Sequence, residues 1–311
     1  MDIVIIGSGA MVGLFGGLLA ESGQVVRLID VPGPHLSALI QHGLRLQTDS
    51  GDRTIGVRAG PADSFAGPCD LAIVFTKGPH TEAAVCAASH LIGPATWVLT
   101  VQNGLGNEAA IRAAVPHARV ATGMTSWPAD LAGPGHVVSH GHGTVRIWSS
   151  EPQPDAAMHQ IAAVLTTAGL DCTADPQVEV AVWEKVAFNA GMNSVAAVTR
   201  LPVGPIADHP AGRALVSAIV TETLAVATAR GLAVDADRVW RTLEMAFADH
   251  RSHQPSMLQD VLAGRQTEIE NINGAIVAYA TELGIDTPVT KSMRDLVRLI
   301  AHAHANAAKL G

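Results

Sequence analysis

Asp2-Ile3-Val4-Ile5-Ile6-Gly7-Ser8-Gly9 opens the chain, and this stretch decides the fold. Its apolar run is typical of a short buried strand, and two glycines follow that run directly. Ala10 to Ser22 then has the pattern of a helix, which Gly23 would end as a C-cap. Val25 to Ile29 is a second apolar run, with Asp30 at its tip. The pattern predicts a strand–helix–strand unit about thirty residues long.

A glycine turn that follows a strand and opens a helix is the context of a dinucleotide-binding fingerprint. The backbone at Gly7, Ser8 and Gly9 can approach a pyrophosphate, and the helix N-terminus at Ala10 and Met11 offers free N–H groups. The third glycine of the usual pattern is displaced by one position, to Gly13. The alternative is a glycine-rich turn that serves only tight packing.

The rest of the first half repeats this alternation. Strands are expected at 71–75 and 97–101, and a helix near 81–91. Alternating strands and helices predict an α/β fold with a parallel, doubly wound sheet of the Rossmann type. In the segment 134–148, two apolar runs flank the glycine-rich His140-Gly141-His142-Gly143, which predicts a hairpin that closes the domain.

Strand patterns nearly vanish after Cys172, and helical periods with Gly and Pro punctuation follow. Asp175-Pro176 is a plausible boundary. We therefore expect a dinucleotide-binding domain over residues 1–174 and an all-helical substrate and catalytic domain over residues 175–311.

Composition excludes several classes of protein. The chain has 311 residues, of which 48% are hydrophobic and 15% charged, so it can bury a large core. A net charge of −8 argues against binding to nucleic acid or to an anionic membrane. Three widely spaced cysteines indicate a reducing compartment, and we expect the cytoplasm. No basic segment precedes the apolar N-terminus, which therefore does not resemble a signal peptide.

Lys185, Asn189 and Asn193 stand four residues apart in an otherwise largely apolar stretch. On a helix these side chains share one face. One ammonium and two carboxamides on that face could bind a small polar substrate. The alternative is an exposed polar stripe on a surface helix.

Three further positions follow predicted strands, where ligands bind in open α/β sheets. Asp30 can accept hydrogen bonds from the adenosine ribose diol of NAD and would repel a 2′-phosphate. Lys77 could meet a phosphate or a ribose hydroxyl, and Asn103 could contact cofactor and substrate together. The alternatives are a solvated aspartate at Asp30 and a simple turn at Asn103-Gly104.

A last group lies near the C-terminus. Ser256 could bind a carboxylate, and Glu268 and Asn271 would face together on a helix. A glutamate near a helix start is also favourable on electrostatic grounds alone. The fourteen histidines form pairs without a recognised metal-ligand spacing, so we expect no metal site.

Taken together, these motifs resemble the ketopantoate reductase (2-dehydropantoate 2-reductase) family over nearly the whole chain. The shared motifs are Ile-Gly-Ser-Gly-Ala, Thr-Lys at 76–77, Gln-Asn-Gly at 102–104, Trp-Glu-Lys at 183–185, Ser-Met-Leu-Gln-Asp at 256–260, Gly-Arg-x-Thr-Glu-Ile-Glu at 264–270, Ile-Asn-Gly at 272–274 and Gly-Ile-Asp-Thr-Pro at 284–288. The C-terminal motifs are far more specific than the glycine turn.

The resemblance implies a Rossmann domain and a helical domain with a cleft between them. It implies reduction of a 2-oxo acid to a 2-hydroxy acid by NAD(P)H, as in pantothenate biosynthesis. In the family's pattern Lys185 matches the catalytic lysine. Asn189, Asn193, Ser256 and Glu268 match substrate-side positions, and Lys77 and Asn103 match cofactor-side positions.

The chain departs from the family at two informative places. Asp30 stands where NADPH-preferring members commonly carry a basic residue, so Asp30 favours NADH whereas the resemblance favours NADPH. Leu201-Pro202-Val203-Gly204 stands where members acting on ketopantoate can carry an asparagine. The alternatives are an opine-type or other 2-hydroxy acid dehydrogenase, or a non-catalytic nucleotide-sensing protein. The expected partner is a small-molecule 2-oxo acid, with a homodimer as one open oligomeric state.

Overall fold

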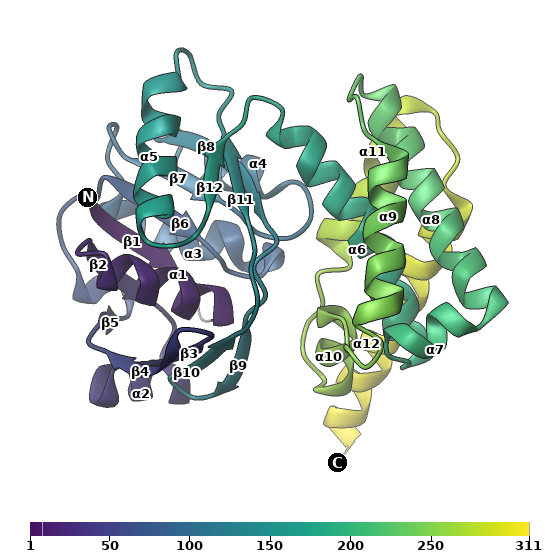
Figure 1. The fold of residues 1–311 in the computed structure, drawn as a ribbon, viewed down its shortest axis with the longest axis horizontal. Helices are drawn as coiled ribbons and strands as arrows, with labels where there is room; N and C mark the ends of the chain where they lie inside the picture. Colours follow the sequence, from purple (N-terminus) through teal and green to yellow (C-terminus); the bar gives the residue numbers. More distant parts are fainter. Residues whose placement is uncertain (8, 311) are drawn as a thin grey trace. The chain divides into compact units, whose positions relative to one another are not determined.

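The computed structural model describes residues 1–7 and 9–310, with the side chains of 305–310 left aside. Contacts between residues divide the chain into two compact units. Unit 1 comprises Met1–Gln102 and Asn107–Val178, and unit 2 comprises the short segment Asn103–Gly106 and the chain from Glu179 onward. Figure 1 shows strands and helices in unit 1 and helices alone in the C-terminal part.

Unit 1 is built on an eight-stranded sheet in the order β12-β11-β8-β7-β6-β1-β2-β5. The six strands from β5 to β8 are parallel, β11 is antiparallel to β8, and β12 is parallel to β11. The strands are β1 Asp2–Ile6, β2 Val25–Ile29, β5 Arg58–Gly60, β6 Leu71–Val74, β7 Trp97–Thr100, β8 Arg119–Thr125, β11 Val145–Trp148 and β12 Cys172–Ala174. This order confirms the predicted doubly wound sheet.

Both faces of this sheet are buried, as period-2 alternation along β1 shows. Ile3 and Ile5 join one apolar core with side chains of α1 (Ala10–Glu21) and α5 (Asp155–Thr167). Val4 and Ile6 join a second core with side chains of α3 (Thr81–Ala87) and α4 (Asn107–Ala114). Helices on both faces explain why these strands read as continuous apolar runs.

A second, four-stranded sheet in unit 1 has the order β4-β3-β10-β9. Its strands are β3 Leu44–Thr48, β4 Gly51–Ile55, β9 Asp130–Gly133 and β10 His136–Ser139, and α2 (Pro34–His42) precedes it. Helix α1 packs against this sheet as well. The approach is so close at Gly13 that a Cβ there would lie only 2.5 Å from Cγ2 of Val137. The displaced third glycine therefore allows close helix–sheet packing.

The predicted hairpin over 134–148 is wrong. β10 pairs with β3 and β9 in the small sheet, whereas β11 pairs with β8 and β12 in the large one. The glycine-rich segment between them is a crossover from one sheet to the other. Two contacts with the Asp49 carboxylate hold it: His140 Nδ1 lies 2.8 Å from Oδ1, and the Gly141 N–H donates to Oδ2. A hairpin and a crossover have the same local sequence pattern, which is two alternating runs around a glycine-rich turn. The two differ only in their partner strands, and these partners lie far away in sequence.

Unit 2 is helical throughout its described residues from Glu179 onward, as the sequence predicted. Its helices are α6 Val178–Thr199, α7 Val203–Asp208, α8 Pro210–Ala229, α9 Ala236–Asp249, α10 Ser256–Leu262, the π-helix η4 Glu270–Gly274, α11 Ala275–Leu283 and α12 Pro288–Leu310. The last strand ends at Ala174 and α6 begins at Val178, so the predicted boundary at Asp175 falls in the connection between them.

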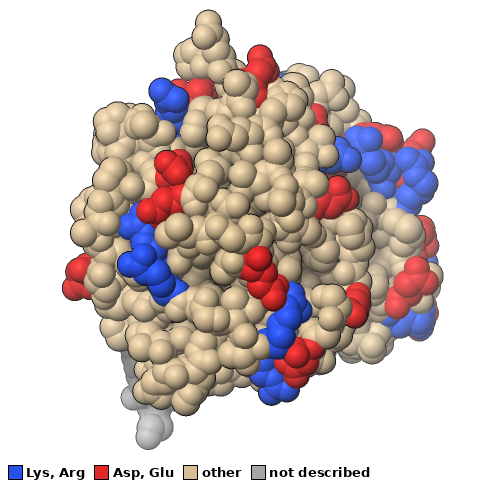
Figure 2. All heavy atoms as spheres, turned by 60° about the vertical axis from the view of Figure 1, so that its left-hand side comes forward, with Lys and Arg blue, Asp and Glu red and all other residues tan. Residues whose placement is uncertain are grey.

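By length and composition alone, α8 could cross a membrane, a test that core helices of globular proteins also pass. Seven of its residues, among them Val216 and Ile219, are buried against the rest of the chain. On the face drawn in Figure 2, acidic and basic side chains are interspersed rather than gathered by sign.

Candidate active site

Helix α6 carries the three predicted polar positions in unit 2. Lys185, Asn189 and Asn193 fall within its Val178–Thr199 span, so the i, i+4, i+8 spacing places them on one face. Asn193 is only 5% exposed, so this face of α6 lies largely within unit 2.

The residue next to Lys185 faces a different element. Glu184 is buried and accepts hydrogen bonds from Arg238 Nε at 2.6 Å and from the Asp235 N–H at 2.8 Å. This ion pair ties α6 to α9. The bidentate geometry fixes the rotation of α6 about its axis, and with it the direction in which Lys185 projects.

Lys185 is half-buried, and burial lowers the pKa of its ammonium to about 8. The negative charge of Glu268 acts in the opposite direction and favours the protonated form. A lysine with a pKa near 8 is still largely protonated at neutral pH and can release its proton readily. These are the properties of a general acid that operates near neutrality.

Glu268 precedes an unusual turn of helix. The Ile272 N–H donates to the Glu268 carbonyl at 3.0 Å, and the Gly274 N–H donates to the Ile269 carbonyl at 2.8 Å. The second bond spans five residues, so η4 is a π-helix instead of the regular α-helix that the sequence predicted. Single π turns occur frequently at functional sites.

Asn271 connects this turn to the loop that follows β7. Its carbonyl accepts a hydrogen bond of 2.7 Å from the Leu105 N–H, and its side-chain amide donates to the Leu105 carbonyl at 3.4 Å. Gly104 has a φ of +82° and lies so close that a Cβ there would be 2.4 Å from the Asn271 carbonyl oxygen. Only glycine fits this position, and the contact places Asn103 beside the π-helix.

Asn273 is a residue whose role sequence reasoning missed. It is fully buried, and its Nδ2 donates to the Ala190 carbonyl of α6 at 3.3 Å. Ala190 stands between Asn189 and Asn193. The segment 268–274 thus contributes a charge toward Lys185, a clamp on the loop at 103–106, and a hydrogen bond to the substrate-side helix. The only sequence signal was the spacing of two asparagines after Glu268.

Ser256 lies apart from this network. It is exposed and begins the short helix α10, behind the buried Pro255. The hydrogen bonds of the described residues link the loop 103–106, η4 and α6, but none of them reaches Ser256. Its part in substrate binding stays a prediction.

In unit 1, the turn after β1 combines a close backbone approach at Gly7 with open space at Gly9. Gly7 has a φ of +138°, and a Cβ there would lie 2.9 Å from the Phe75 backbone at the end of β6. A Cβ on Gly9 would meet no atom within 4 Å, so open space lies over the start of α1. Helix α1 begins without a side-chain cap or an acidic residue in its first turn, which leaves its N-terminus at Ala10 and Met11 available to an anion. Ser8 lies outside the described residues.

Two basic residues stand near Asp30 in the sequence, Arg27 and His35, and each has a hydrogen-bond partner other than Asp30. Arg27 is 3% exposed and pairs with Asp2, Nε to Oδ1, at 3.0 Å, so its guanidinium points away from the tip of β2. His35 accepts a hydrogen bond at Nδ1 from the Gly135 N–H, and burial lowers the pKa of its imidazole. Asp30 itself is buried and caps the following turn through the Val31 N–H.

Gln102 joins the ends of two neighbouring strands. Its Nε2 donates to the Thr76 carbonyl at 2.6 Å and lies 2.8 Å from Thr81 Oγ1. These two contacts hold the loop that carries Lys77 against the end of β7. Gln102 directly precedes Asn103 in the sequence. Within the described residues, no group of three or more His, Cys, Asp or Glu side chains is placed to hold a metal ion.

Comparison with known proteins identifies the family of the chain. The profile described as "Ketopantoate reductase PanE/ApbA" matches residues 3–151, and its C-terminal counterpart matches residues 177–301. The chain belongs to the ketopantoate reductase family. A 2-dehydropantoate 2-reductase of Halobacterium salinarum is 34% identical over 96% of this chain and 98% of its own length. One of Pyrococcus abyssi is 30% identical over 96% and 97%.

Solved structures carry the same fold over the whole chain. A PanE/ApbA family ketopantoate reductase from Ralstonia eutropha has a TM-score of 0.90 at 32% identity and covers 98% of this chain and 100% of its own. A D-mandelate dehydrogenase solved with NADH and anilino(oxo)acetate has a TM-score of 0.93 at 30% identity, with the same coverage.

These relatives confirm the predicted family, fold class and enzyme class, an NAD(P)-dependent oxidoreductase acting on CH–OH groups. The use of a nicotinamide dinucleotide is supported by the family and by the NADH-bound neighbours.

Proposed function

We propose that this protein reduces a 2-oxo acid to a 2-hydroxy acid with NAD(P)H, with the reduction of 2-dehydropantoate to pantoate as the first candidate reaction. The observation that carries the proposal is the half-buried Lys185, whose ammonium is influenced by Glu268 and which shares a helix face with Asn189 and Asn193. The proposal includes a cytoplasmic location and a part in pantothenate biosynthesis.

The chemistry follows from this arrangement. A bound reduced nicotinamide would supply a hydride to the keto carbon of the substrate. Negative charge then develops on the former carbonyl oxygen, and the Lys185 ammonium stabilises that charge and donates its proton. Glu268 helps to keep Lys185 protonated before the reaction. The neutral amides of Asn189 and Asn193 hold the substrate's oxygens without adding charge.

Further substrate contacts come from Asn103, which the hydrogen bonds of Leu105 place beside η4. Ser256 is proposed to bind the carboxylate. In unit 1, the turn at Gly7 to Gly9 and the helix start at Ala10 and Met11 would hold the pyrophosphate, with Lys77 as a cation at the end of the neighbouring strand.

We propose NADH as the preferred cofactor. A carboxylate at Asp30 favours a ribose diol and disfavours a 2′-phosphate. Arg27, which could have blunted this preference, is bound to Asp2, and burial lowers the pKa of His35 and so disfavours its charged form, although Asp30 acts in the opposite direction. The NADH named for two similar structures supports the same choice.

A second candidate substrate is a 2-oxo acid with an aryl group on the keto carbon. The D-mandelate dehydrogenase structure matches this chain with a TM-score of 0.93. Leu201-Pro202-Val203-Gly204 also offers no polar side chain where ketopantoate-specific members can carry an asparagine. Residues of this composition are better suited to an apolar substrate group than to a hydroxyl.

The deciding experiment is a panel of 2-oxo acids, including 2-dehydropantoate, phenylglyoxylate and pyruvate, each with NADH and with NADPH. Oxidation is followed through the nicotinamide absorbance. A clear rate with one branched or aryl 2-oxo acid supports the proposal and identifies the substrate. Tight binding of the reduced cofactor without oxidation by any acid would favour the nucleotide-sensing alternative.

A further inference from the structure

An ion pair joins the π-helix η4 to the last helix of unit 2. Glu270, the first residue of η4, accepts two hydrogen bonds from the Arg298 guanidinium of α12, with Nε to Oε1 at 2.6 Å. Asp295 Oδ1 accepts from Arg298 Nη1 at 3.3 Å and from Arg294 Nε at 2.9 Å. A bidentate pair of arginine and carboxylate fixes the orientation of both side chains as well as their separation.

The Glu270 carboxylate lies beside the bond that defines the π turn. A Cβ on Gly274 would be 2.9 Å from Glu270 Oε2 and 3.4 Å from the Ile269 carbonyl oxygen. That carbonyl accepts the hydrogen bond of the Gly274 N–H, which spans five residues. The glycine therefore leaves room for the carboxylate next to this bond, and Arg298 holds the carboxylate in that place.

Helix α12 is anchored independently of η4. Glu222 of α8 accepts hydrogen bonds from the N–H groups of Val289 and Thr290, at 3.0 and 2.8 Å, in the first turn of α12. Further along the helix, Met293 and Val297 are buried. Because α12 is fixed by these contacts, an ion pair from α12 can hold η4 in one geometry.

The geometry of η4 matters for the residue that precedes it. The chain continues from η4 into the regular α-helix α11, so the π turn competes with an ordinary α-helical turn. That change would alter the rotation of the residues before the turn relative to those after it, because a regular turn contains about one residue fewer. Glu268 stands two residues before η4, is half-buried, and its charge acts on Lys185.

We propose that Glu270 and Arg298 are positioning residues, whose ion pair holds η4 in its π turn and thereby directs Glu268 toward Lys185. Neither side chain is assigned a contact with substrate or cofactor. The kinetic consequence of this inference rests on the proposed function, in which Lys185 donates a proton. The placement of Glu268 itself does not depend on turnover.

The test is a direct titration of Lys185 by NMR. The chain has four lysines, at positions 77, 185, 291 and 309, so protein labelled with ¹³C at the lysine ε-carbons gives few signals, and Lys185→Ala assigns the one of interest. Glu268→Gln removes the charge and sets the full effect on the pKa of Lys185. Arg298→Gln and Glu270→Gln should each lower this pKa by about half a pH unit, as part of that effect.

The sign of the Arg298→Gln result separates positioning from direct electrostatics. Loss of a nearby cation would by itself raise the pKa of a lysine. A lower pKa therefore requires that Glu268 has moved. Arg298→Lys keeps the charge and one contact with Glu270, so it should lie between the wild type and Arg298→Gln.

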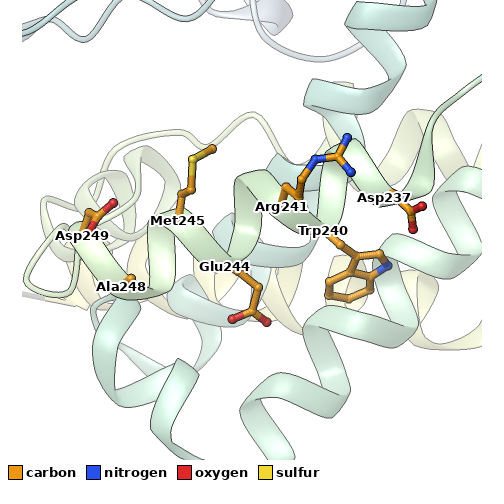
Figure 3. A pocket seen from close by; sticks show the side chains of 7 residues that line it. All are labelled: Asp237, Trp240, Arg241, Glu244, Met245, Ala248 and Asp249. Carbon is orange, nitrogen blue, oxygen red and sulfur yellow. The ribbon is translucent and has the colours of Figure 1, made fainter.

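The matched control is the ion pair between Arg213 of α8 and Glu244 of α9. It is also bidentate, with Nη1 to Oε1 at 2.6 Å, and its side chains are 47% and 53% exposed, against 46% and 48% for Arg298 and Glu270. Figure 3 shows Glu244 on the flank of α9 that also bears Trp240. Arg213→Gln and Glu244→Gln should leave the pKa of Lys185 unchanged.

Circular dichroism and thermal unfolding establish that each variant is folded. A lower pKa of Lys185 in both Arg298→Gln and Glu270→Gln, but not in the control variants, supports the inference. An unchanged or raised pKa in Arg298→Gln overturns it, even where thermal stability falls. With a 2-oxo acid that the enzyme reduces, the alkaline decline of kcat/KM should move to lower pH together with the titration. If no 2-oxo acid is reduced, the proposed function fails, and the titration still decides whether Glu270 and Arg298 position Glu268.

Discussion

At the scale of single residues, the proposed chemistry depends on the pKa of Lys185. The protein lowers this pKa but leaves the side chain protonated at neutral pH. Burial removes the ammonium from water and lowers its pKa to about 8, while Glu268 limits the fall. The balance leaves a cation at neutral pH that is a better proton donor than a surface lysine. Neither effect was visible in the sequence, where Lys185 and Glu268 are far apart.

The pH dependence of reduction follows from this balance. Only protonated Lys185 can donate, so kcat/KM for 2-oxo acid reduction should be level below a pH of about 8 and fall as the pH rises through the pKa. In Lys185→Arg the guanidinium stays protonated over this range, so the remaining kcat/KM should not fall above a pH of about 8. A wild-type profile without any decline up to pH 10 would contradict the assignment of Lys185 as proton donor.

The proposed preference for NADH depends on a single residue, Asp30. We expect kcat/KM to favour NADH over NADPH by about tenfold, or about 1.4 kcal/mol, which one charged contact can supply. Asp30→Ala should raise KM for NADH and narrow the gap, whereas Asp63→Ala, at an exposed acid of the same unit, should leave the ratio unchanged. A tenfold preference of the unmodified protein for NADPH would show that other groups hold a 2′-phosphate.

At the scale of elements, the π-helix η4 connects the loop at 103–106 to helix α6. Its wide turn directs Asn271 to the loop at 103–106 and Asn273 to the backbone of α6. In a regular α-helix each turn contains about one residue fewer, so Asn273 would point in a different direction relative to Asn271. The π turn thus permits both contacts.

Asn273→Ala tests this view. The variant loses a buried hydrogen bond, which should lower the free energy of unfolding by about 0.5–1.5 kcal/mol. Because Ala190 lies between Asn189 and Asn193, KM for the 2-oxo acid should rise while KM for the cofactor stays constant. The matched control is Thr281→Ala, which removes a side-chain bond to the Val277 carbonyl in α11. If Asn273→Ala changes thermal stability alone, its role is only structural.

The same scale shows what could be predicted from the sequence. The βαβ start and the helix that carries Lys185, Asn189 and Asn193 depend on neighbours within one or two turns, and the structure contains both. The small sheet and the π turn depend on contacts between distant segments, such as β10 with β3 or Asn271 with Leu105. Local patterns do not encode these partners, which explains why a crossover was read as a hairpin and Asn273 was missed.

At the scale of the whole molecule, the chain assigns different tasks to its two units. Unit 1 provides a doubly wound sheet with a glycine turn and a free helix start, and unit 2 provides the lysine, the amides and the glutamate. The segment Asn103–Gly106 leaves the sheet of unit 1 and is held by Asn271 in unit 2. This segment therefore belongs to unit 2, although the residues on both sides of it in sequence belong to unit 1.

The central claim is that this molecule reduces a 2-oxo acid with Lys185 as the proton donor. The most direct measurement is kcat of the wild type and of Lys185→Ala, with the best 2-oxo acid and saturating cofactor. Removal of the charge should lower kcat by roughly 10²–10⁴-fold, with cofactor affinity and thermal stability nearly unchanged. Lys291→Ala, at an exposed lysine of α12, should behave as the wild type. A Lys185→Ala enzyme with near-normal kcat would contradict the account.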